Sequence, residues 1–251
     1  MIIIPMAGQS RRFHDAGYTR PKYELPLGGE SLFAACTRSF EHYFHTERFV
    51  FVHRRDFGAG AFIAAECARL GIADVVSIGL DGPTRGQAET VLLGLEGAGY
   101  TGSESILIFN IDTIRPHYVF PAVADASDGY LEVFSGAGTH WSFVRPAAAF
   151  GSRVAQATEK QRISSLCCTG LYYFARAADF AAICSDALRD IDGYREQWGE
   201  LYIAPMYNTL IGAGKRVVYH QTGADQVHFA GTPSEYHALL ASLDASRRKL
   251  F

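Results

Sequence analysis

Residues 2–22 read IIIPMAGQSRRFHDAGYTRPK, a short apolar run followed at once by a glycine and a group of basic side chains. The run Ile2–Pro5 has no polar interruption, which predicts a strand covered on both faces of a sheet. The stretch after it predicts a loop in which Gly8 lets the backbone turn sharply and aim its N–H groups at an anion. Positive charge is supplied by Arg11, Arg12, Arg20 and Lys22. Because the loop after the first strand of a parallel sheet is a common phosphate site, we expect phosphate to bind here.

Strand-like and helical segments alternate through the first half of the chain. Apolar runs at 48–53 and 105–112 predict further buried strands, and apolar spacing of three to four predicts helices at 31–44, 61–71 and 87–97. This order predicts an α/β fold with a mostly parallel sheet and right-handed crossovers.

The second half begins with strand-like pieces that follow one another without a helix between them. They lie at 128–136, 140–146, 153–160 and 167–174 and predict antiparallel additions to the same sheet. Helices are predicted at 178–190, at 201–214 and from Thr232, where Thr232, Pro233 and Glu235 form a helix-start signature. Residues 1–251 contain no linker, repeat or low-complexity tract, so one domain is the simplest prediction.

Composition excludes several classes of function. The net charge of −3 gives no global positive field for a nucleic acid, and no stretch approaches the roughly 20 apolar residues of a membrane span. We therefore expect a cytoplasmic protein with neither nucleic acid nor membrane as a partner. The five cysteines lack CxxC spacing, which disfavours a disulfide framework or a zinc site and predicts reduced, mostly buried thiols.

The basic loop and a downstream aspartate leave alternatives open. The loop is neither GxGxxG nor a P-loop, and GQSRR fails the GxSxG pattern, so a solvated basic surface loop is the structural alternative. Asp112 ends an apolar run and should lie at the carboxyl edge of the sheet, because burying an unpaired carboxylate is costly. There it either caps the next helix or holds Mg²⁺ against phosphate oxygens.

Seven motifs together resemble one enzyme family. In order along the chain they are PMAGQSRRF with the later PK, RGQAETV, NID, TEK, TGLYYF, ELYIAP and GTPSEY. Their order and spacing resemble the sugar-1-phosphate nucleotidyltransferases, especially the NTP-transferases of capsule and lipopolysaccharide biosynthesis. The resemblance implies a Rossmann-like, three-layer α/β/α fold with a mixed, mostly parallel sheet, the nucleotide-diphospho-sugar transferase fold. It further implies that an acceptor phosphate attacks the α-phosphate of an NTP and releases pyrophosphate.

The resemblance also assigns roles to residues. By their match to the glycine-rich loop, the nucleotide-binding set is Ala7, Gly8, Gln9, Ser10 and Arg11. Arg12 would hold the β and γ phosphates, and Lys22 would reach the α-phosphate. Gln87 would read a pyrimidine, which leaves CTP, UTP and dTTP open; its structural alternative is a simple helix-start residue.

The acceptor and metal sites follow in the same way. Asp112 matches the Mg²⁺ aspartate, and the predicted acceptor contacts are Glu159, Lys160, Gly170, Thr169 and Trp141. The aspartate that many members carry just before the last GT motif is absent here, where Phe229 and Ala230 stand, so Asp225 is the candidate second metal ligand. The structural alternatives are an exposed charged turn for Glu159 and Lys160 and a core position for Trp141.

Three functions remain open at this point. The first is an Mg²⁺-dependent transfer of NMP from a pyrimidine NTP to a sugar 1-phosphate for surface-polysaccharide assembly. The second is a CTP-dependent cytidylyltransferase acting on a non-sugar phosphate, such as phosphocholine or a phosphorylated amino acid. Ala204 and Pro205 weaken the hexose reading, because sugar-nucleotide enzymes often have acidic residues there. The third is a catalytically weak nucleotide sensor or partner subunit, and a homo-oligomer stays open for each.

Overall fold

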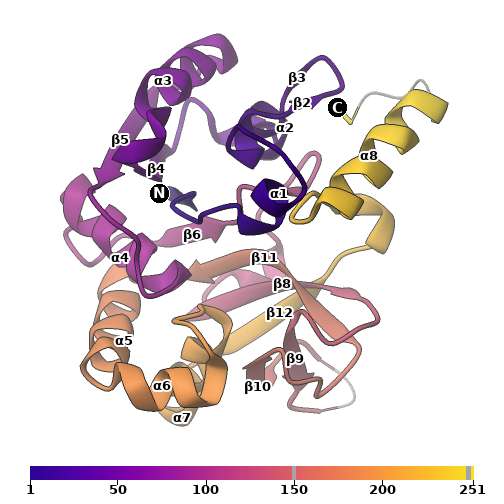
Figure 1. Ribbon diagram of the computed structural model, residues 1–251. Helices are drawn as coiled ribbons and strands as arrows, with labels where there is room; N and C mark the ends of the chain where they lie inside the picture. Colours follow the sequence, from indigo (N-terminus) through magenta and orange to yellow (C-terminus); the bar gives the residue numbers. More distant parts are fainter. Residues whose placement is uncertain (149–150, 247–249) are drawn as a thin grey trace.

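A central mixed sheet organises the computed structural model, which describes residues 1–148, 151–246 and 250–251 (Figure 1). Within these residues nine strands form the sheet, with the order β10-β9-β11-β6-β1-β4-β5 and with β8 joined to β11 and β12. The strands are β1 (Ile2–Pro5), β4 (Arg48–Arg54), β5 (Asp74–Leu80), β6 (Ile106–Phe109), β8 (Gly129–Ser135), β9 (Ser142–Pro146), β10 (Val154–Glu159), β11 (Leu166–Phe174) and β12 (Val217–Gln221).

The two halves of the chain contribute differently to the sheet. Strand β1 pairs in parallel with both β4 and β6, and β4 pairs in parallel with β5. Strand β11 runs antiparallel to β6, β8 and β9, and β9 runs antiparallel to β10. The predicted parallel core with antiparallel additions is therefore confirmed. It places the carboxyl ends of β1 and β6 side by side, where a ligand site is expected.

Helices cover both faces of the sheet, because successive side chains of a strand point to opposite sides. Ile2 and Ile4 pack in one cluster with α1, α2, α3 and α8, whereas Ile3 packs in another with α4, α5 and α7. The helices are α1 (Arg11–Asp15), α2 (Leu32–Arg38), α3 (Ala59–Leu70), α4 (Gln87–Ala98), α5 (Ala177–Arg189), α6 (Ile191–Trp198), α7 (Tyr207–Gly212) and α8 (Pro233–Ser246). The predicted three-layer α/β/α fold is confirmed.

Helix α8 lies beside α1 although the two are far apart in the sequence (Figure 1). The rings of Phe13 and Tyr236 make an edge contact with centroids 6.2 Å apart, and Tyr18 Oη lies 2.7 Å from His237 Nε2. The predicted start of α8 is confirmed: the hydroxyl of Thr232 accepts from the N–H of Glu235, whose carboxylate accepts from the N–H of Thr232. The C-terminal helix thus braces the segment that follows β1.

Several segments differ from prediction for local reasons. The predicted helix at 31–44 stops at Arg38 and continues as the 3₁₀ turn Glu41–Tyr43. The predicted helix at 201–214 begins only with the 3₁₀ turn Ala204–Met206, because Pro205 has no N–H and suits a first turn. Strands β5 and β12 and helix α6 were not predicted.

Two further predictions concern the cysteine side chains and membrane-spanning helices. All five cysteines are buried and free, as expected. Within the described part of the chain, no helix is long and apolar enough to cross a bilayer.

A two-residue ladder completes the surroundings of Asp112. Strand β7 (Thr113–Ile114) pairs antiparallel with β13 (His228–Phe229), and the N–H of Ala230 donates to the carbonyl of Asp112 over 2.8 Å. A second ladder, β2 (Pro26–Leu27) with β3 (Glu30–Ser31), leads into α2. The β7–β13 ladder brings the residues before α8 to the end of β6.

Candidate active site

A cleft of about 630 Å³ opens at the carboxyl ends of β1 and β6, where the fold predicts a ligand site. Its walls come from the chain after β1, the start of α4, the turn after β6 and the region around α6. The lining residues are 5–12, Asp15, Lys22, Tyr23, 83–87, Thr90, 110–112, Arg195 and Glu200. All the residues predicted for nucleotide binding and catalysis therefore share one cleft.

Basic side chains outnumber acidic ones in this cleft. The basic members are Arg11, Arg12, Lys22, Arg85 and Arg195, and the acidic members are Asp15, Asp112 and Glu200. Within the described residues, the side chains of Arg12 and Arg195 make no ion pair. An acidic chain thus concentrates positive charge in one concave place, and two guanidinium groups there are free to meet an anion.

The turn after β1 is made at Ser10, not at Gly8 as predicted. Ser10 has φ 49° in the left-handed region, whereas Gly8 does not, and a Cβ on Gly8 would meet no atom within 4 Å. The expected open loop also contains a helical turn, because the carbonyl of Ser10 accepts from the N–H groups of Phe13 and His14. Phe13 is buried, so the turn is anchored to the core and leaves the arginines beside it exposed.

Lys22 and Asp112 form an ion pair in the cleft, with 2.5 Å between Nζ and Oδ2. Lys22 begins the 3₁₀ turn Lys22–Glu24 after Pro21, and Asp112 lies three residues beyond the end of β6. Asp112 caps no helix, because the next element is strand β7. The two side chains predicted to meet the α-phosphate and the metal therefore lie together, each about four-fifths buried.

Gln87 starts a helix and also lines the cleft, so the helix-start interpretation is confirmed and its role in reading a pyrimidine stays a prediction. It is the first residue of α4, and its side-chain amide donates to Oδ1 of Asn110. Behind Asn110 lies Gly170, with φ +95°; a Cβ there would be only 2.5 Å from Asn110 Nδ2. Gly170 thus permits a close approach of Asn110, a side chain of the cleft wall, and its predicted contact with the acceptor stays a prediction.

Glu159 and Lys160 lie beyond the cleft lining, next to the α6 region. Glu159 is buried and accepts a hydrogen bond from the hydroxyl of Ser142, and burial raises the pKa of its carboxyl group. Lys160 has φ +54°, and its ammonium donates to Tyr202 Oη over 2.5 Å. Burial alone would lower the Lys160 pKa, but the hydrogen bond to Tyr202 and the nearby carboxylates of Glu159 and Glu200 together outweigh it, so the pKa is raised. Lys160 is therefore a charged side chain held by a phenol.

The remaining predicted acceptor contacts lie outside the residues that line the cleft. Thr169 is buried, and its hydroxyl contacts Glu132. Trp141 packs against Phe134 and Phe229 with ring centroids 5.1 and 4.7 Å away. These aromatic contacts agree with the alternative that Trp141 is a packing residue. The acceptor roles of Thr169 and Trp141 stay predictions.

A backbone bridge connects the segment that carries Gln87 to the segment that carries Tyr202. The N–H of Ala88 donates to the carbonyl of Leu201, and the N–H of Leu201 donates to the carbonyl of Arg85, over 2.9 and 3.1 Å. A Cβ on Gly86 would lie 2.5 Å from Leu201 N, so only glycine allows this approach. The residue after Leu201 is Tyr202, the partner of Lys160.

The residues around Asp112 fit a Mg²⁺ ion shared with phosphate oxygens. A Cβ on Gly231 would fill the space 3.0 Å from Asp112 Oδ2, and it would lie 3.5 Å from Glu235 Oε2. Asp225 is exposed on the 3₁₀ turn Ala224–Gln226 and does not line the cleft. In the part of the chain that the structure describes, no group of three or more His, Cys, Asp or Glu could hold a metal. A Mg²⁺ ion here would have Asp112 as its protein ligand and complete its shell with phosphate and water, which this ion accepts; its binding stays a prediction.

Several polar residues line the cleft without having been predicted from the sequence, among them Arg85, Asn110, Arg195 and Glu200. Asn110 had a signal, because it directly follows a buried strand at the same edge as Asp112. Arg85 pairs with Glu89 one helical turn away. Arg195 and Glu200 flank the end of α6, and only the fold brings them to the cleft.

Comparison with solved structures identifies the family. A nucleoside-diphosphate-sugar pyrophosphorylase from Vibrio cholerae RC9 is 45% identical, with a TM-score of 0.89 over 96% of this chain and 100% of that one. The chain belongs to this family. It is accordingly a nucleotidyltransferase.

More distant proteins with the same fold are similar to this chain over almost its whole length. A putative glucose-1-phosphate thymidylyltransferase from Bacillus anthracis is 17% identical, with a TM-score of 0.76 over 96% of this chain and 94% of that one. An inositol-1-phosphate CTP transferase from T. maritima is 15% identical, with a TM-score of 0.70 over 97% and 95%. These two show the fold alone. No family model and no curated protein matches this chain.

Proposed function

We propose that this nucleotidyltransferase requires Mg²⁺ and transfers NMP from a pyrimidine NTP to a sugar 1-phosphate, with release of pyrophosphate. The observation that carries the proposal is the Lys22–Asp112 pair, which lies in a basic cleft beside the unpaired guanidinium of Arg12. An NTP with its metal matches this combination of one carboxylate and several cations. The pyrophosphorylase name of the 45% identical relative supports the reaction class.

In the proposed reaction, an oxygen of the acceptor phosphate attacks the α-phosphorus of the NTP. The bond from the α-phosphorus to the oxygen that bridges to the β-phosphate breaks, and pyrophosphate leaves with that oxygen. The chain needs only to position two anions and to offset the charge on the reacting phosphate. Mg²⁺, when bound, supplies positive charge to the phosphate oxygens.

The cationic side chains divide this work between them. Lys22, pre-oriented by Asp112, approaches the α-phosphate, and Arg12 holds the β and γ phosphates. Gln87 reads the pyrimidine with an amide that Asn110 fixes in place. Lys160 receives the acceptor phosphate by exchanging the Tyr202 hydroxyl for a phosphate oxygen. A place in capsule or surface-polysaccharide assembly rests on the resemblance of the sequence motifs.

The first experiment is pyrophosphate release from CTP, UTP, dTTP, ATP and GTP, each with Mg²⁺ and a panel of phosphorylated acceptors. The panel contains sugar 1-phosphates, inositol 1-phosphate, phosphocholine and phosphorylated amino acids. We expect turnover with one pyrimidine NTP and one sugar 1-phosphate. Turnover with phosphocholine or a phosphorylated amino acid instead would replace the acceptor class, and NTP binding without any turnover would favour the sensor.

A matched pair of lysine variants tests the mechanism. Lys22→Ala should lower kcat by about 10²–10³-fold, as for loss of one preorganised charge, with a much smaller change in NTP affinity. Lys215→Ala is the control, because Lys215 also pairs with an aspartate, Asp128 at 3.2 Å, but lies outside the cleft lining. Equal rates for the Lys22 variant and the wild type would remove Lys22 from the chemistry.

A further inference from the structure

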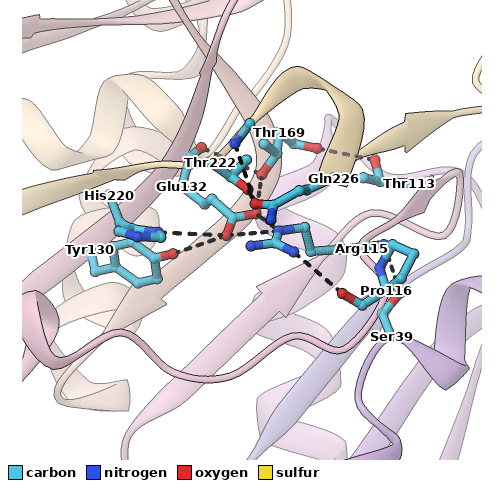
Figure 2. A network of polar contacts seen from close by, with 11 residues as sticks. Ser39, Thr113, Arg115, Pro116, Tyr130, Glu132, Thr169, His220, Thr222 and Gln226 are labelled. Atoms are coloured by element: carbon cyan, nitrogen blue, oxygen red, sulfur yellow. Dashed lines mark hydrogen bonds and ion pairs between the residues drawn. The ribbon is translucent and has the colours of Figure 1, made fainter. Parts of the chain in front are cut away.

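Glu132 is a fully buried carboxylate in β8, surrounded by polar side chains from β8 itself and from other segments (Figure 2). Its Oε1 accepts from Arg115 Nε at 3.1 Å and from the Thr169 hydroxyl at 3.3 Å. Its Oε2 accepts from Arg115 Nε at 3.2 Å and from the Tyr130 hydroxyl at 3.4 Å. His220 Nδ1 is 4.0 Å from Oε2, which is too far for a hydrogen bond. Arg115 therefore both forms an ion pair with Glu132 and donates hydrogen bonds to it, whereas His220 donates none.

Arg115 is fixed at its backbone as well as at its side chain. Its N–H donates to the hydroxyl of Ser39 over 2.9 Å, and its Nη1 donates to the carbonyl of Pro116 over 3.3 Å. Only 11% of its side chain is exposed. The guanidinium thus ties the chain just after β7 to the centre of β8.

Two of the hydrogen-bond partners of Glu132, Arg115 and Thr169, lead towards the cleft. Arg115 follows Asp112 by three residues, with β7 between them. Thr169 precedes Gly170, which packs against Asn110, and its carbonyl accepts from the hydroxyl of Thr113 over 3.1 Å. One buried carboxylate therefore anchors the turn after β6, which lines the cleft, and the Thr169–Gly170 segment that packs behind Asn110.

Net stability is a poor explanation for such a pair. Removing two charges from water costs free energy that their attraction repays only in part, and apolar replacements of buried pairs are often as stable. A buried ion pair does, however, define a single geometry, because its donors and acceptors have few alternative partners. The location of this pair, behind Asp112 and Asn110, makes that geometry useful.

We propose that Arg115 and Glu132 are positioning residues for the transfer reaction. The pair fixes the turn 110–114, and so the place of the Asp112 carboxylate, while the Thr169 contact fixes the Gly170 segment behind Asn110. Neither side chain lines the cleft. The effect of the pair on catalysis rests on the proposed function, whereas its effect on the position of the turn does not.

Two variants and two measurements test the pair. Arg115→Met removes the ion pair, and Arg115→Met with Glu132→Leu also removes the unpaired buried carboxylate, so the double variant should fold even if the single one does not. We expect kcat for pyrophosphate release to fall about 10²-fold in both, with NTP affinity within about two-fold, because a displaced turn disturbs the reacting geometry more than binding. Backbone amides of 110–115 should exchange with deuterium about ten-fold faster.

A control separates positioning from stability. Lys215→Met breaks the Lys215–Asp128 pair and should change neither kcat nor exchange at 110–115. A double variant with wild-type kcat and wild-type exchange at 110–115 would overturn the proposal. If the wild-type chain releases no pyrophosphate with any substrate pair, the proposed function fails, and the exchange measurement still decides whether the pair fixes the turn.

Discussion

Replacement of Gly170 by alanine should destabilise the folded chain by about 2–5 kcal/mol. The backbone contributes first, because Gly170 has φ +95° and an L side chain in that region costs about 1–2 kcal/mol. Steric overlap contributes more, because the new Cβ would lie 2.5 Å from Nδ2 and 2.7 Å from Cγ of Asn110. Overpacking of this kind costs about 1–3 kcal/mol.

Asn110 has little freedom to relieve the overlap. Its Oδ1 accepts from Gln87, and its N–H donates to the carbonyl of Gly170 over 3.1 Å. Any shift that makes room for the methyl group therefore moves the side chain that fixes Gln87. The stability loss should come with a higher KM for the NTP.

Urea unfolding measures the loss, and a second glycine separates its two causes. Gly99 also has a positive φ, +70°, but a Cβ there would meet no atom within 4 Å. Gly99→Ala should therefore show only the backbone cost, about 1–2 kcal/mol. If Gly170→Ala loses no more than Gly99→Ala, the close approach to Asn110 has no energetic weight and the reasoning is wrong.

Two further predictions concern a buried acid and a helix cap. Burial raises the Glu159 pKa, so the folded chain keeps a proton that the unfolded chain releases above about pH 4.3, and stability is lost as the pH rises from there through the folded pKa. Glu159→Gln should therefore gain stability relative to the wild type across that window in urea unfolding at pH 4–8. Thr232→Ala removes one of the two capping bonds of α8 and should cost about 1 kcal/mol by the same method.

Each of these outcomes has a clear opposite. A stability difference between Glu159→Gln and the wild type that does not change with pH would mean that the carboxyl group carries no burial penalty. Ser234→Ala is the control for the cap, because Ser234 is exposed two residues further along α8. Equal stability of the Thr232 and Ser234 variants would show that the cap does not stabilise the helix.

The elements that follow local rules were predictable. Strand β1 occupies Ile2–Pro5 as expected, because four consecutive apolar residues suit a strand covered on both faces. The start of α8 followed from Thr232 and Glu235, whose side chains cap the helix over a spacing of three residues. The clustering of Arg12, Lys22 and Asp112 also followed, since the carboxyl ends of parallel strands share one edge.

Features set by distant packing were not predictable in the same way. Propensity favoured a turn at Gly8, yet the left-handed residue is Ser10, because burial of Phe13 fixes where the helical turn must start. Arg195 reaches the cleft only through the position of α6, a helix that gave no distinct sequence signal. Asp225 seemed the nearest substitute for a second acidic ligand by sequence distance, but the β7–β13 ladder places Gly231 beside Asp112 instead.

The contact between Gly86 and Leu201 makes the two halves of the site one mechanical unit. Because the backbones are bonded on both sides of Gly86, a displacement of the segment with Gln87 is passed to Tyr202 and hence to Lys160. Thermodynamic linkage then requires symmetry. If a ligand beside Gln87 changes the binding free energy of a ligand at Lys160, the ligand at Lys160 changes the binding free energy of the first by the same amount. Cooperativity between two substrates would thus be carried by a single pair of peptide groups.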